Sequence, residues 1–195
     1  MTPSDYLITF YSVIAGLTAT IYIQKWGELL QQRRYVLYVT VPLLWSFCFF
    51  NLVVYEWFTH FKWEATTNSF MFLMALSVPF LLYGIGMLLF PTTDMLDRKD
   101  KYAYLDYYEH FRQNKTWIMS FGLFIFAIKF FSAWFYNTEG IGFFDGLWQF
   151  LCFKRNYLAI VALLIALFTE HKGQMLVLGL VLFYVWLSTW AYVSI

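Results

Sequence analysis

Apolar residues gather in six long stretches, separated by short polar segments. These stretches cover about residues 6–23, 36–58, 70–90, 117–136, 157–169 and 175–193. A helix needs about 20 apolar residues to cross the hydrocarbon core of a bilayer. The fifth stretch is short, but charged residues flank it, and their side chains can reach toward the interface from its ends. The pattern predicts an all-α membrane protein, a single polytopic domain built as a bundle of six transmembrane helices.

Two of the connecting segments have a pattern of their own. In the loop covering residues 91–115, Tyr104, Tyr108 and Phe111 recur at helical spacing among charged residues. This spacing is typical of a short amphipathic helix that lies in the membrane interface. A second interfacial or re-entrant segment is expected at residues 140–153, where aromatic residues alternate with glycines.

Composition agrees with a membrane location. Hydrophobic residues make up 61% of the chain and charged residues 13%, whereas soluble domains contain about 45–50% and about 25%. A small soluble domain could not bury so much apolar surface. The net charge of +1 gives no basic field for nucleic acid.

The distribution of basic residues predicts the orientation of the chain. With six spans, nine of the 13 Lys and Arg residues fall in loops on one side and three on the other. The positive-inside rule then places the loop at residues 91–115 in the cytoplasm and both termini outside. The expected location is a bacterial inner membrane.

Lys129 is the most informative charged residue, because it lies slightly past the middle of the fourth apolar stretch. Placing an ammonium group in hydrocarbon costs about 2.5–3.5 kcal/mol on insertion scales. Gly122 and Ser132 lie on the same helical face, so this face is expected to point into protein or a water-filled path. Lys129 is either a permeation-path or binding-site cation, or a structural lysine that snorkels or forms one ion pair.

Glu56 is the predicted partner of Lys129. The second and fourth stretches place both residues in the outer half of the bundle, and pairing would lower the desolvation cost of each. Asp5, at the start of the first stretch, is the second choice. Pro79 interrupts the third stretch, and such a break either borders a transport site or is an ordinary kink.

Evidence for enzymatic chemistry is weak. Asp106 and His110 have i, i+4 spacing and Glu109 lies beside them, but a metal site needs three or four converging ligands. No nucleophile motif or phosphate-binding loop is present. We therefore expect no catalytic residue, no metal and no cofactor.

These observations leave three classes of function. The leading hypothesis is passage of an ion or small solute through a transporter or channel built as a homo-oligomer. The alternative is a non-conducting partner or sensor subunit, including a membrane effector of a signalling or defence system, that binds protein through residues 91–115. The third is a lipid-modifying enzyme that uses Asp106, Glu109 and His110.

Overall fold

The computed structural model describes residues 3–31, 36–60, 69–91, 105–136 and 154–193. This part of the chain forms six helices, together with two strands of two residues each. The helices are α1 (Pro3–Gln31), α2 (Thr40–His60), α3 (Ser69–Leu89), α4 (Tyr107–Tyr136), α6 (Lys154–Phe168) and α7 (Lys172–Val193).

Three helices are long and apolar enough to cross a membrane. Their qualifying segments are Thr40–Phe58 in α2, Phe72–Leu89 in α3 and Tyr107–Ser132 in α4. In α6 and α7 the described apolar segments are shorter, Asn156–Phe168 and Lys172–Val185. The all-helical class and the presence of membrane-spanning helices thus agree with the sequence, while the number of passes stays a prediction.

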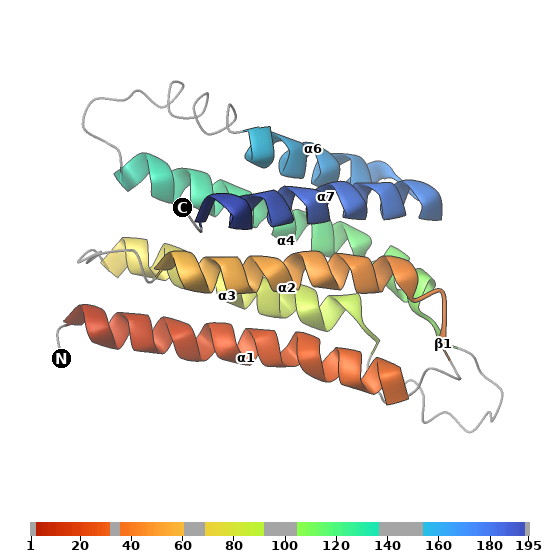
Figure 1. The fold of residues 1–195 in the computed structure, drawn as a ribbon, viewed down its shortest axis with the longest axis horizontal. Coiled ribbons are helices and arrows are strands. Elements are labelled where there is room, and N and C mark those ends of the chain that lie inside the picture. Colours follow the sequence, from red (N-terminus) through yellow and green to blue (C-terminus); the bar gives the residue numbers. More distant parts are fainter. Residues whose placement is uncertain (1–2, 32–35, 61–68, 92–104, 137–153, 194–195) are drawn as a thin grey trace.

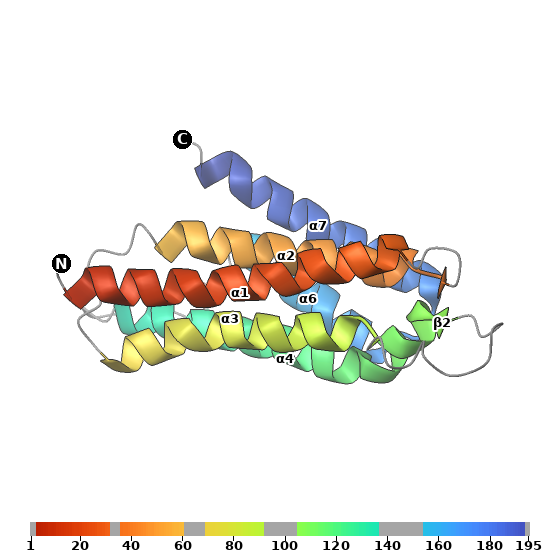
Figure 2. The same cartoon turned by 90° about the horizontal axis from the view of Figure 1, so that it is seen from below.

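The helices run alternately in opposite directions, so α1 begins and α7 ends at the same end of the bundle (Figure 1). We call this the terminal end, and the opposite end, which carries β1, the loop end. α1 packs on α2 and α3, α4 packs on α3 and α6, and α7 packs on α6 and α2. α2 also contacts α3 and α4, so it packs against four of the other described helices. Toward its C-terminus, α7 diverges from α2 (Figure 2).

Close helix approaches depend on glycine and on side chains that donate to a neighbouring backbone. A Cβ at Gly179 would lie 2.8 Å from Cδ2 of Leu44, and Trp45 Nε1 donates to the Met175 carbonyl at 3.1 Å, so α2 and α7 are in tight contact. α1 is held to α3 in the same way, since the Tyr22 hydroxyl donates to the Leu82 carbonyl at 2.8 Å. Interhelical hydrogen bonds of this kind contribute about 0.6 kcal/mol each in membranes.

The loop end is tied together by a short parallel ladder. β1 (Val36–Leu37) pairs with β2 (Leu105–Asp106), with Val36 opposite Leu105 and Leu37 opposite Asp106. The ladder joins the connection before α2 to the connection before α4. It also shows that residues 36–39, which the sequence assigned to the second span, precede the helix.

The fourth apolar stretch and the proposed interfacial helix form one element. α4 runs for 30 residues from Tyr107, so residues 107–115 are its first turns. Tyr108 and Phe111 are buried in the bundle, and Tyr104 lies outside the described residues. Residues 107–115 therefore do not form a separate helix in the membrane plane. They are the start of α4, and their apolar face continues in phase into the core of the bundle. The segment at residues 140–153 also lies outside the described residues.

Candidate functional site

Lys129 and Glu56 form an ion pair between α4 and α2. Lys129 Nζ contacts Glu56 Oε1, the pairing that the sequence predicted. The Glu56 side chain is 5% exposed and that of Lys129 is 25% exposed. The carboxylate is thus almost fully removed from solvent, and the ammonium group compensates its charge.

Aromatic residues complete the surroundings of this pair. Lys129 Nζ lies 5.2 Å from the centre of the Tyr55 ring, within the range of a cation–π interaction. Tyr11, from α1, is buried within electrostatic range of the Glu56 carboxylate. We call Tyr11, Tyr55, Glu56 and Lys129 the charge cluster. It joins α1, α2 and α4 in the half of the bundle nearer the terminal end.

Among the other predicted site residues, Ser132 shares a helix face with Lys129 and is buried. Pro79 is buried inside α3, where its carbonyl accepts a hydrogen bond from the Thr18 hydroxyl at 3.2 Å. The structure therefore places Pro79 at the contact between α1 and α3. Asp5 belongs to the start of α1, and its side chain lies outside the described part.

A proline inside a helix leaves one backbone carbonyl without its usual donor, and the nearby Ser77 hydroxyl or a water could serve it. The Ser77 hydroxyl instead donates to the carbonyl of Met74 at 2.6 Å. The carbonyl that a proline at position 79 frees is that of Ala75, four residues earlier. The two glycines that follow serve packing: a Cβ at Gly86 would lie 3.1 Å from the Tyr22 ring, and one at Gly84 would lie 3.4 Å from Phe121.

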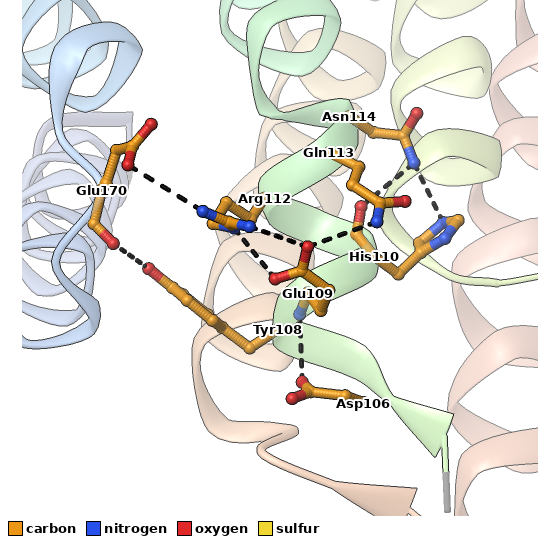
Figure 3. A network of polar contacts seen from close by, with 8 residues as sticks. All are labelled: Asp106, Tyr108, Glu109, His110, Arg112, Gln113, Asn114 and Glu170. Atoms are coloured by element: carbon orange, nitrogen blue, oxygen red, sulfur yellow. Dashed lines mark hydrogen bonds and ion pairs between the residues drawn. The ribbon is translucent and has the colours of Figure 1, made fainter. Parts of the chain in front are cut away.

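A second polar region lies at the loop end, on the first turns of α4 (Figure 3). Asp106 caps this helix, because its Oδ1 accepts a hydrogen bond from the Glu109 backbone N–H at 3.0 Å. Arg112 donates to both carboxylate oxygens of Glu109, from Nε and Nη2, at 2.9 Å each. Arg112 also reaches Glu170 at 3.9 Å.

Two α4 residues of this region complete the end of a neighbouring helix, α6. The Tyr108 hydroxyl donates to the Glu170 carbonyl and Lys115 Nζ to the Thr169 carbonyl, both at 2.6 Å, just after α6 ends. His110 and Asn114 lie on the other side of α4, where Asn114 Nδ2 donates to the His110 carbonyl at 3.1 Å and lies 3.2 Å from His110 Nε2. The last carbonyls of a helix have no partner within it. We call Tyr108 and Lys115 the capping residues.

Each of the three polar residues that the enzyme hypothesis uses, Asp106, Glu109 and His110, has a separate contact of its own. Asp106 is a helix cap, Glu109 is held by Arg112, and the His110 ring lies beside Asn114. In the described ranges, no group of three or more His, Cys, Asp or Glu residues is arranged to hold a metal. The three polar residues therefore do not converge on one point.

Sequence reasoning missed the role of Lys115, which it treated as one of the loop cations. Lys115 is 8% exposed and caps α6. The missed signal was the spacing of Tyr108, Phe111, Lys115 and Ile118, which keeps the helical phase through the lysine.

Comparisons with models of protein families, with curated proteins and with solved structures find no match to this chain.

Proposed function

We propose that the protein is a non-conducting membrane subunit that binds a protein partner at its loop end. The observation that carries this proposal is the filled interior of the bundle. Fully buried large side chains recur every seven residues along α4, at Phe111, Ile118 and Ile125. These positions cover about 21 Å of the helix axis. The hydrocarbon core is about 30 Å thick, so the buried side chains extend over about two thirds of it.

The charge cluster supports the same interpretation. A cation that selects anions in a path needs a charge that the passing ion can reach. Lys129 is neutralised by Glu56 and lies beside Tyr55, so its interactions are satisfied within the chain. Its role in this proposal is to fix α4 against α2.

The loop end offers a surface that suits a partner. The capping residues and the β1–β2 ladder hold three connections in fixed positions, and Arg112, Glu109 and Glu170 keep 43%, 42% and 68% of their side chains exposed there. Charged groups of both signs on a rigid support favour specific protein contacts. By the positive-inside rule this end faces the cytoplasm and both termini face outward, as expected for an inner-membrane protein.

Ion passage by a homo-oligomer is the second candidate, and one observation favours it. A quarter of the Lys129 side chain is exposed on the surface of a single chain. If copies assemble around this face, Lys129 would line the contact between them, where an anion could approach.

Ion flux into proteoliposomes separates the two candidates. For the non-conducting subunit, vesicles with the wild-type protein should pass chloride, potassium and protons no faster than protein-free vesicles. Flux above that level that is lost in Lys129→Met and kept in Lys25→Met would establish the conducting assembly and overturn our proposal. Lys25 is a suitable control because it pairs with Glu28 within α1.

The partner surface can be tested in cells with a photo-crosslinking amino acid. At position 112 it should yield a discrete adduct with a second protein. At Leu17, an exposed apolar position on α1, it should yield none. Equal labelling at the two positions would contradict a partner site at the loop end.

A further inference from the structure

Lys172, the first residue of α7, lies between two tyrosine rings. Its Nζ is 3.4 Å from the centre of the Tyr38 ring and 4.7 Å from that of Tyr108. Both distances are within the range of a cation–π interaction. Tyr38 follows β1, and Tyr108 belongs to α4, so one ammonium group connects three separate parts of the loop end.

Tyr38 and Lys172 are both in locally unfavourable arrangements, one of the backbone and one of charge. Tyr38 has φ of 54°, a left-handed conformation that a bulky side chain rarely adopts. Lys172 places a positive charge at the N-terminus of a helix, where the helix dipole disfavours cations. Strained arrangements cluster at ligand clamps and switch regions, and they persist only where the surrounding structure holds them in place.

The segment held by this contact is the turn between α6 and α7. The Tyr108 hydroxyl also donates to the Glu170 carbonyl in this turn. α7 diverges from α2 toward its C-terminal end, so its firm contacts with the bundle lie near the turn (Figure 2). Trp45 holds the Met175 carbonyl from α2, so releasing the turn would free the residues before Met175 while the rest of α7 stays attached.

We propose that Tyr38, Lys172 and Tyr108 form a releasable latch that holds the α6–α7 turn against the loop end. In the closed state the ammonium group lies between the rings and the left-handed backbone at Tyr38 is maintained. On release, Tyr38 can leave the left-handed region and Lys172 can move away from the helix axis. Two unfavourable local states are relieved together, which lowers the cost of opening. This inference does not depend on whether the protein conducts ions or binds a partner.

Hydrogen–deuterium exchange of the wild-type protein and three variants in micelles tests the latch. The reporter is the Met175 amide, which donates to the His171 carbonyl at 3.0 Å in the first turn of α7. Lys172→Met and Tyr38→Asn should each speed its exchange about tenfold. Tyr38→Phe keeps the ring and should exchange like wild type.

The second measurement separates a latch from a simple stabilising contact. Amides of α2 at residues 45–53 should exchange at the wild-type rate in all variants. Tyr38→Asn should keep or raise the temperature of global unfolding, because asparagine tolerates the left-handed conformation. Unchanged exchange at Met175 in Lys172→Met and Tyr38→Asn would overturn the proposal. Equal acceleration in α2 and at Met175, with a lower unfolding temperature, would also overturn it.

Discussion

The two ends of the bundle use charged side chains in different ways. In the half nearer the terminal end, Lys129 and Glu56 neutralise each other between two helices, and the carboxylate is almost fully buried. At the loop end, Lys115 donates to a backbone carbonyl and Arg112 pairs with carboxylates near the surface. Removing one charge should therefore have very different effects at the two ends, depending on what is left without a partner.

The largest effect is expected at the charge cluster. Lys129→Met keeps the length of the side chain and removes its charge, leaving the Glu56 carboxylate buried without its cation. Breaking a buried ion pair in this way costs about 3–5 kcal/mol. Unfolding in mixed micelles, followed by tryptophan fluorescence, should show this loss. Lys25→Met is the control, and its loss should be clearly smaller, because the Glu28 carboxylate left behind is 22% exposed and still accepts a hydrogen bond from Gln24.

Lys115→Met should have the next largest effect. This change removes the donor to the Thr169 carbonyl at the end of α6. Hydrogen bonds to charged groups contribute about 1.5–3 kcal/mol, so we expect a loss of about 2 kcal/mol in the same unfolding assay. Lys115→Arg keeps a cationic donor and should recover part of this loss. If Lys115→Met were as stable as wild type, the capping role of this lysine would be wrong.

Tyr108→Phe removes one neutral hydrogen bond and keeps the ring. The Glu170 carbonyl then loses the hydroxyl donor at 2.6 Å. The expected loss is about 1 kcal/mol, with a local rise in the exchange of amides near the α6–α7 turn. A loss comparable to that of Lys129→Met would show that the two ends do not differ as we argue.

Arg112→Gln should have the smallest effect. Arg112 forms two ion pairs, but its side chain is 43% exposed and Glu170 is 68% exposed. Exposed ion pairs contribute about 0.2–1 kcal/mol, and salt screens them. The unfolding free energy should change by less than about 0.5 kcal/mol at high salt. A larger loss that persists at high salt would mean that Arg112 supports the fold.

Much of the helical framework could be predicted from the sequence. The third stretch was expected at residues 70–90, and α3 is Ser69–Leu89. The pairing of Lys129 with Glu56 also followed from sequence, because both charges lie at similar depth in apolar stretches and pairing lowers the desolvation cost of each. Continuous apolar runs and isolated charges are local signals that do not require knowledge of packing.

Other features depended on contacts between distant residues. α1 continues to Gln31, beyond its apolar stretch, where Lys25 and Glu28 pair one turn apart. The delay of α2 until Thr40 depends on the ladder with β2 and on the left-handed Tyr38. No residue in this segment signals that conformation. Polar residues at 112–116 concealed the continuity of α4. Their charges suggested that a loop ended there, although the buried positions of the helix continue through this segment.

The measurement that tests the central claim most directly is a double-mutant cycle on Lys129 and Glu56. The claim is that Lys129 is a structural cation whose charge is satisfied by Glu56 within a filled bundle. Unfolding free energies of wild type, Lys129→Met, Glu56→Gln and the double variant are measured in the same micelles. We expect Glu56→Gln to restore most of the stability that Lys129→Met loses, with a coupling of at least about 2 kcal/mol, within the range for contacting residues. Additive losses in the double variant would show that the two charges are not stabilised by each other, and would contradict the account.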